Sequence, residues 1–107
     1  MKDKLLNIIE KAKQGNANAQ YIIGSHYYFD KNDFLTGLYW LRQAEKQLHE
    51  NACLMLYAIY NEGCHVKHDK KKAKHYLLKS RLQFYKTEYN KAFGNISKLT
   101  LLNDKNS

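Results

Sequence analysis

The chain has 107 residues, of which 44% are apolar and 13% aromatic, so it can bury one continuous core. This composition excludes a disordered chain, and the absence of proline together with only five glycines favours helices. The first ten residues lack the apolar core of a signal peptide, and no run approaches the roughly 18 apolar residues of a membrane span. We therefore expect a cytoplasmic protein without a membrane partner.

Apolar residues at helical spacing predict six helices, of which three lie in the first half of the chain. The first predicted helix carries the stripe Leu5, Ile8, Ile9 and Ala12. The second carries Ala19, Ile23, Gly24 and Tyr27. The third begins after Asp33, whose side chain can accept the free N–H groups of the first turn. Its stripe is Gly37, Trp40, Leu41, Ala44 and Leu48.

The second half of the chain repeats this arrangement. The fourth predicted helix carries Ala52, Leu56 and Tyr60, and the longest loop follows it at residues 62–68. The fifth helix begins after the cap Asp69 and carries Ala73, Tyr76, Leu77, Ser80 and Phe84. The sixth carries Tyr89, Ala92, Phe93, Ile96 and Leu99. The pattern predicts one all-α domain over residues 1–102 and a frayed tail at residues 103–107.

The second to fifth predicted helices form two copies of one unit. In the first helix of the unit, Ala19, Ile23 and Tyr27 recur 33 residues later as Ala52, Leu56 and Tyr60. In the second helix, Asp33, Gly37, Trp40 and Ala44 recur 36 residues later as Asp69, Ala73, Tyr76 and Ser80. The change of offset places three additional residues in the loop of the second copy, where insertions are tolerated.

These spaced residues resemble the Sel-one-like repeat (SLR), a relative of the tetratricopeptide repeat (TPR). The first copy matches the family pattern at Gly15, Ala19, Gly24, Tyr27, Asp33, Trp40 and Ala44. The second matches at Ala52, Leu56, Tyr60, Gly63, Val66, Asp69, Lys72 and Ala73. The resemblance covers about residues 12–100, but Tyr57 and His65 replace family glycines and Gly37 replaces an alanine. It implies a short right-handed helical-repeat solenoid of about two SLR/TPR-like helix pairs plus flanking helices, acting as an adaptor or scaffold.

Stacked helix pairs present a concave surface to a partner. Residues on the first helix of each pair that face away from the predicted core are therefore candidates for protein binding, because aromatic residues and Met are enriched at interface cores. The candidates are Tyr21, Tyr28, Phe29, Met55 and Asn61, with Lys91 and Lys98 at a basic end. Packing against a neighbouring helix is the alternative for the aromatic residues and for Met55.

The net charge of +8 lies entirely in the last part of the chain. Residues 1–66 hold seven Lys/Arg and seven Asp/Glu, whereas residues 67–107 hold eleven Lys/Arg and three Asp/Glu. The predicted basic patch consists of Lys67, Lys70, Lys71, Lys74 and Arg81. The patch suits a protein partner with an acidic surface, and nucleic acid or plain solvation remain alternatives.

No catalytic, metal or cofactor motif is present in the sequence. His65 and His68 have the spacing of a zinc-ligand pair, but Cys64 is adjacent to His65 and no second Cys is close, so the cluster with His75 does not indicate a zinc site. His26 and His49 have no evident carboxylate or thiol partner. Cys53 and Cys64 would lie about 15 Å apart along a helix, too far for a disulfide. The sequence therefore favours a non-enzymatic protein-binding module without cofactors, for example a bacterial immunity protein that neutralises a toxin. The alternatives are a nucleic-acid-binding protein that uses the basic C-terminal third, and a homodimer.

Overall fold

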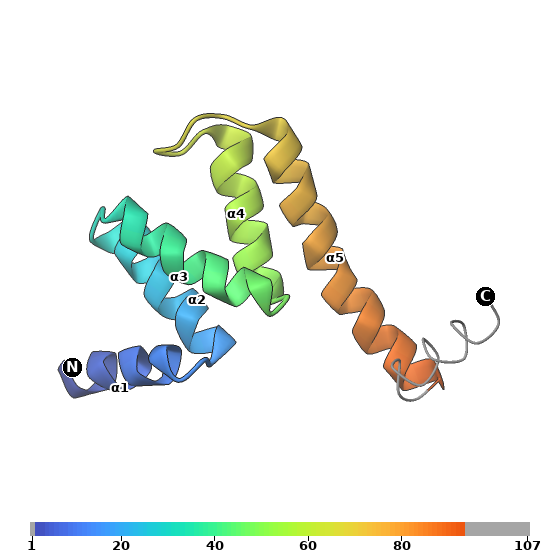
Figure 1. The fold of residues 1–107 in the computed structure, drawn as a ribbon, viewed down its shortest axis with the longest axis horizontal. Helices are drawn as coiled ribbons and strands as arrows, with labels where there is room; N and C mark the ends of the chain where they lie inside the picture. The colour runs from blue at the N-terminus through green and yellow to red at the C-terminus, as the bar shows by residue number, and fades with distance from the viewer. Residues whose placement is uncertain (1, 94–107) are drawn as a thin grey trace.

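The computed structural model describes residues 2–93, which form five α-helices and one π-helical turn without any strand (Figure 1). The elements are α1 (Lys2–Lys13), α2 (Ala17–Ser25), η1 (His26–Asp30), α3 (Phe34–Lys46), α4 (Glu50–Glu62) and α5 (Lys70–Phe93). The prediction of an all-α chain is thus confirmed for the described residues. The predicted roles of Ile96, Lys98 and Leu99 and the predicted tail at residues 103–107 lie outside them.

Polar side chains begin the helices where the sequence predicts it. The Asp33 carboxylate accepts a hydrogen bond from the Thr36 backbone N–H at 3.3 Å, and the Asp69 carboxylate accepts one from Lys72 at 3.0 Å. Both predicted caps are therefore confirmed. Helix α4 ends at Gly63, whose φ of 70° lies in the left-handed region that glycine adopts without strain. The long loop spans residues 63–69, close to its predicted position.

The prediction of separate fifth and sixth helices is wrong within the described residues. Helix α5 runs without a break from Lys70 to Phe93, through the segment between Phe84 and Tyr89 where the sequence analysis placed a boundary. Neither glycine nor proline occurs between residues 70 and 93, so nothing in the backbone chemistry ends the helix there.

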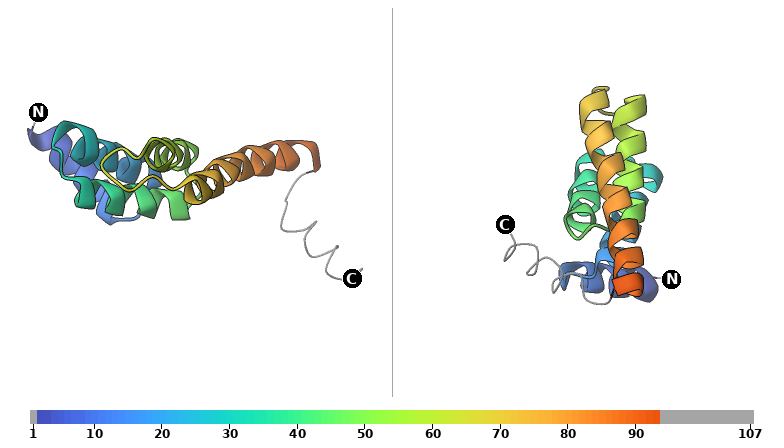
Figure 2. Two further views of the ribbon diagram at one scale, coloured as in Figure 1. Left: turned by 90° about the horizontal axis from the view of Figure 1, so that it is seen from above. Right: turned by 90° about the vertical axis from the view of Figure 1, so that its right-hand side faces the viewer.

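Each helix packs on the next one along the chain. Helix α1 packs on α2, α2 on α3, α3 on α4, and α4 on α5. The two pairs α2–α3 and α4–α5 run antiparallel, and α4 and α5 lie side by side in two perpendicular views (Figures 1 and 2). Consecutive antiparallel packing makes a row of helices with two broad outer faces.

The buried side chains form two clusters. The larger one joins η1, α3, α4 and α5 and consists of Tyr28, Leu41, Leu56, Ile59, Tyr60, Ala73 and Tyr76. The smaller one joins α1 to α2 and consists of Ala12, Ala19 and Ile23, with Ile8, Ile9, Tyr27 and Trp40 packed against it. Most of the predicted core stripe is confirmed, including Ala44, Ala52 and Ser80, which are buried.

Two glycines allow α2 and η1 to approach α3 closely. A Cβ atom on Gly37 would lie 2.7 Å from the Cβ of Tyr28 and 2.8 Å from its backbone nitrogen. A Cβ atom on Gly24 would lie 2.9 Å from both Cγ and the backbone nitrogen of Leu41. Such contacts are too short for any side chain. Gly37, which departs from the family pattern, is therefore required by the close approach of the π-helical turn.

The second half of α5 extends beyond its partner helix (Figure 1). At 1.5 Å per residue, the 13 residues of α4 span about 20 Å and the 24 residues of α5 about 36 Å. Phe84 is consequently exposed, which corrects its predicted place in the core. The apolar side chains Leu78, Leu82 and Tyr85 are exposed on the same helix.

Candidate functional site

An apolar groove lies between α1, α2 and η1. It encloses about 410 Å³ and is lined by Leu5, Tyr21, Ile22, Ile23, Ser25, His26, Phe29 and Asp30. Leu5 and Ile22 are exposed there, and Phe29 leaves 49% of its surface open to solvent. We call this surface the concave groove. It brings together Tyr21 and Phe29, two of the residues that the sequence proposes for protein binding.

Two residues that line the concave groove, Tyr21 and Ser25, also contact the second half of the chain. The Tyr21 ring stacks on His49 with their centroids 4.9 Å apart. The Ser25 hydroxyl lies 2.9 Å from the Tyr21 carbonyl oxygen and 3.3 Å from Met55 Sδ. Met55 is half-buried and packs against the larger core cluster, so part of its predicted binding surface is used internally.

His49 is held as a neutral imidazole at the start of α4. Its Nδ1 atom accepts a hydrogen bond from the Ala52 N–H at 3.2 Å, and its Nε2 atom lies 3.3 Å from the Asn18 side-chain oxygen. An acceptor at Nδ1 requires the proton to be on Nε2, which then donates to Asn18. Burial lowers the pKa of His49 below its usual 6.5, which stabilises this neutral form.

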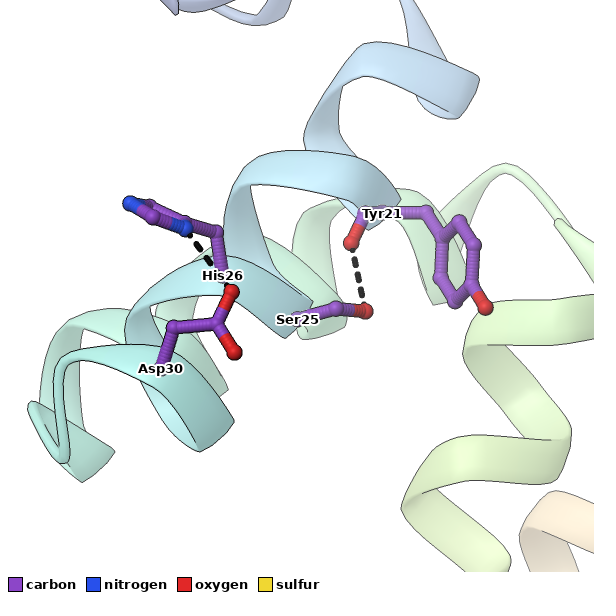
Figure 3. A network of polar contacts seen from close by, with 4 residues as sticks. All are labelled: Tyr21, Ser25, His26 and Asp30. Atoms are coloured by element: carbon purple, nitrogen blue, oxygen red, sulfur yellow. Dashed lines mark hydrogen bonds and ion pairs between the residues drawn. The ribbon is translucent and has the colours of Figure 1, made fainter.

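His26 has a carboxylate partner that the sequence analysis missed. Its Nδ1 atom lies 3.0 Å from Asp30 Oδ2, at the i, i+4 spacing that places two side chains on one helix face. This spacing could have revealed the pair. Figure 3 shows the imidazole and the Ser25 hydroxyl directed to opposite sides, and that hydroxyl is bonded to Tyr21. The three residues are not arranged as a serine nucleophile and its base.

Tyr28 does not belong to the exposed set proposed from the sequence. Its side chain is fully buried, and its hydroxyl donates a hydrogen bond to the Cys64 carbonyl oxygen. Tyr28 follows Gly24 by one helical turn, so it lies on the face that packs against α3. Tyr27, by contrast, is only half-buried against the smaller core cluster.

Lys91, which the sequence predicts to form a basic end of the binding surface, does not lie at the concave groove. Lys91 lies near the end of α5, which points away from α2 and η1, and it pairs with Glu88 at 3.3 Å (Figure 1). Lys98 is outside the described residues, and Asn61 is half-buried on α4. The ionisable groups of the groove itself are Tyr21 and the His26–Asp30 pair. The lining of the groove is therefore mainly apolar, and it contains Asp30 but no Lys or Arg.

The predicted basic patch is exposed, as expected for cationic side chains. Lys67 lies in the long loop, and Lys70, Lys71, Lys74 and Arg81 follow along α5. Lys72, which the sequence analysis assigned to the family pattern, is half-buried with its amino group 4.7 Å from the centre of the Tyr60 ring. It forms a cation–π contact with the core and is a structural residue.

The cysteines and histidines of the second copy do not form a reactive cluster in the described structure. Both thiols are free, and burial raises the pKa of Cys53 to about 11, which keeps it protonated at neutral pH. His65 stacks on Phe34 with centroids 3.9 Å apart. Within residues 2–93, no three His, Cys, Asp or Glu side chains converge as a metal ion would need. None of the helices in this part of the chain has the length and apolar content to cross a membrane.

Comparisons of the chain with protein families, with curated proteins and with solved structures find no match.

Proposed function

We propose that the chain is a non-enzymatic helical-repeat module of the SLR type that binds another protein through the concave groove. The observation that carries the proposal is the exposure of Leu5, Ile22 and Phe29 around one groove. Apolar and aromatic anchors that fill such a depression contribute most of the affinity of many protein complexes. A dedicated inhibitor, such as an immunity protein that covers a toxin, is one concrete form of such a module.

The repeat assignment is supported by two features of the molecule. The caps Asp33 and Asp69 occupy equivalent positions in the two sequence copies, and both begin the second helix of an antiparallel pair. Consecutive pairs also pack in chain order. Short repeat arrays leave their end faces uncovered, so a partner that covers such a face would raise the apparent stability by mass action.

The net positive charge of the sequence suggests a partner with an acidic surface, but the residues that line the groove favour an apolar one. Asp30 offsets the charge of His26 when the imidazole is protonated and leaves one negative charge when it is neutral, so in neither state does the groove attract an acidic surface. We propose that the partner inserts an apolar segment here and that any acidic surface of the partner meets α5 instead.

The test is a pull-down from the native cell with the full chain as bait, comparing Ile22→Ser/Phe29→Ser with the matched control Leu6→Ser. Leu6 is exposed on α1 and does not line the groove. The groove variant should lose a partner that the wild type and the control retain, with thermal unfolding showing that each variant is folded. Retention of the same partner by both variants would exclude the groove.

The nucleic-acid alternative is separated by nuclease treatment and by salt. Phosphate contacts weaken steeply between about 50 and 200 mM salt, whereas an apolar contact does not. Binding that survives nuclease and high salt but fails in the groove variant supports the protein partner. Binding that disappears with nuclease and is unchanged in the groove variant would favour nucleic acid on the basic patch.

A further inference from the structure

A second depression begins between α3 and α5 and continues along α5. One cavity of about 580 Å³ lies between the two helices, and another of about 520 Å³ continues along α5, with His75 and Lys79 lining both. A third cavity shares Leu82 and Tyr85 with the second and reaches Leu48 after α3. The shared residues make these cavities one continuous surface, the α3–α5 trough. It has no lining residue in common with the concave groove.

Where the α3–α5 trough continues along α5, it is apolar and lies on the outer face of that helix. Leu78, Leu82 and Tyr85 are 54%, 52% and 62% exposed and are separated by four and three residues. This spacing keeps the three side chains in one row along the helix, as in the seam of two packed helices. The row lies on the opposite side of α5 from Ala73, Tyr76 and Ser80, which are buried against the rest of the fold. Packing within the described residues therefore does not explain why these three positions are apolar.

The walls of the α3–α5 trough are cationic. They carry Arg42, Lys46, Lys79, Arg81 and Lys86. The acidic residue among the described lining residues is Glu45, which is buried and bound by Lys79. An occupant therefore meets an apolar row with positive charge on both sides.

We propose that the α3–α5 trough binds an amphipathic helix of another protein whose apolar row is flanked by Asp and Glu. The helix would lay its row on Leu78, Leu82 and Tyr85, and its carboxylates would meet Arg81 and Lys86, which line the same part of the trough. This surface is additional to the concave groove and stands independently of it.

The charges disfavour the two other occupants. In a second copy packed through the same row, Arg81 and Lys86 of one helix would face the same cations of the other. Residues 94–107 of the chain contain two lysines, Lys98 and Lys105, and one acidic residue, Asp104. The one acidic residue of α5, Glu88, is paired with Lys91 at 3.3 Å. Neither occupant therefore supplies acidic residues on both flanks of an apolar row.

The experiment measures binding of a fluorescent three-heptad peptide to the full chain by anisotropy. The peptide has Leu at the a and d positions and Glu at the e and g positions, and its matched control has Lys in place of Glu. The Glu peptide should bind at least about tenfold more tightly than the Lys peptide, and its affinity should decrease with salt. Equal affinity for the two peptides, or no binding of either, would overturn the proposal.

Variants locate the binding on the protein. Leu82→Ser/Tyr85→Ser should weaken the Glu peptide at least about tenfold, since the apolar row carries the contact area. Ile22→Ser/Phe29→Ser, in the concave groove, should not change its affinity, so failure of the two sites can be told apart. Arg81→Glu/Lys86→Glu should shift the preference toward the Lys peptide, a gain of binding that an unfolded chain cannot show. An unchanged preference in this charge-reversed variant would refute the trough.

Three other outcomes would assign the trough to a different occupant and overturn the proposal. The first is a chain that is dimeric by light scattering and becomes monomeric with Leu82→Ser/Tyr85→Ser. The second is a higher affinity for the peptide in the full-chain variant Ile96→Ser/Leu99→Ser. This result would show that residues 94–107 compete with the peptide for the trough. The third is displacement of the Glu peptide by a single-stranded oligonucleotide whose own binding is unaffected by Leu82→Ser/Tyr85→Ser.

Discussion

The Tyr28 hydroxyl donates a hydrogen bond to the carbonyl oxygen of Cys64, 36 residues further along the chain. The bond joins η1 in the first helix pair to the loop that precedes α5 in the second. The Tyr28 ring also packs edge to face on Phe34, with the ring centroids 5.1 Å apart. Burial raises the pKa of the Tyr28 hydroxyl to about 12. Tyr28 also belongs to the same buried cluster as Leu56 and Ile59 of α4, so it connects the two pairs through both polar and apolar contacts.

Replacing Tyr28 with Phe removes only the hydroxyl. We expect a loss of about 1–2 kcal/mol in the free energy of unfolding, because the Cys64 carbonyl loses its donor in a partly buried loop. Urea unfolding measures the change, with Tyr39→Phe as the control because Tyr39 is exposed on α3. Equal stability of the two variants would show that the loop is held by other contacts.

Replacing Gly37 with Ala tests the close approach of η1 and α3. In an exposed helix this change stabilises by about 1 kcal/mol, because alanine has the higher helix propensity. Here the new Cβ would lie 2.7–2.9 Å from the Cβ and backbone atoms of Tyr28, so the sign should reverse and stability should decrease by about 1–3 kcal/mol. A variant that melts at a higher temperature than wild type would contradict this packing.

The local features of the fold could be predicted because they depend on short sequence spans. The caps Asp33 and Asp69 need only the turn that follows them, and the buried stripes need only the helical period. The exposure of Phe84 could not be predicted in this way. It depends on where α4 ends alongside α5, which is a property of the packed pair and is not encoded in the helical period of α5 itself.

The features of the candidate sites also divide into local ones, which the sequence reveals, and those that depend on packing between helices. The pairing of His26 with Asp30 is local and was available from the i, i+4 spacing. The contact of Tyr21 with His49 joins residues 28 positions apart and requires the packing of two helix pairs. The sequence placed Lys91 with the aromatic candidates, but the length of α5 carries it away from them (Figure 1).

The state of His49 makes the stability of the chain depend on pH. Because the pKa of His49 in the folded chain is below 6.5, the unfolded chain binds more protons as the pH falls through this range. The stability contributed by the neutral imidazole is therefore present above about pH 6.5 and is lost at lower pH. His49→Asn retains a capping acceptor without a titrating group, so its free energy of unfolding should decrease less between about pH 6.5 and pH 5.

The control for His49 is His75→Asn, because His75 is exposed on α5. Its pH dependence should match that of the wild type. If His49→Asn and the wild type lose stability in parallel as the pH falls, the cap at the start of α4 does not require a neutral imidazole.

Trp40 joins α3 to the smaller core cluster. It is half-buried and packs against the cluster formed by Ala12, Ala19 and Ile23, so it links α3 to its pair partner α2 and contacts the cluster to which α1 contributes. Trp40→Ala should reduce the free energy of unfolding by about 3 kcal/mol, near the lower end for large aromatic truncations because part of the ring is exposed. Leu35→Ala, at an exposed position of α3, should leave the unfolding midpoint nearly unchanged.

The Glu45–Lys79 pair provides the sharpest test of how α3 and α5 are joined. The Glu45 side chain is 8% exposed and the Lys79 side chain 27%, and the two groups form a salt bridge 34 residues apart in the chain. Removing one member of a buried pair costs about 3–5 kcal/mol, because it leaves the other charge without compensation, and partial exposure of Lys79 should reduce this cost. Lys79→Met should therefore destabilise by about 2–3 kcal/mol.

The double variant Glu45→Gln/Lys79→Met distinguishes a lost attraction from a stranded charge. Without the carboxylate, no buried charge is left unpaired, so the double variant should regain at least about 1 kcal/mol relative to Lys79→Met alone. Glu45→Gln alone should also lower the pKa of the Cys53 thiol, because that pKa is raised first by burial and then by the Glu45 carboxylate. Additive destabilisation by the two substitutions would mean that Glu45 and Lys79 contribute independently and that the salt bridge does not hold α5 against α3.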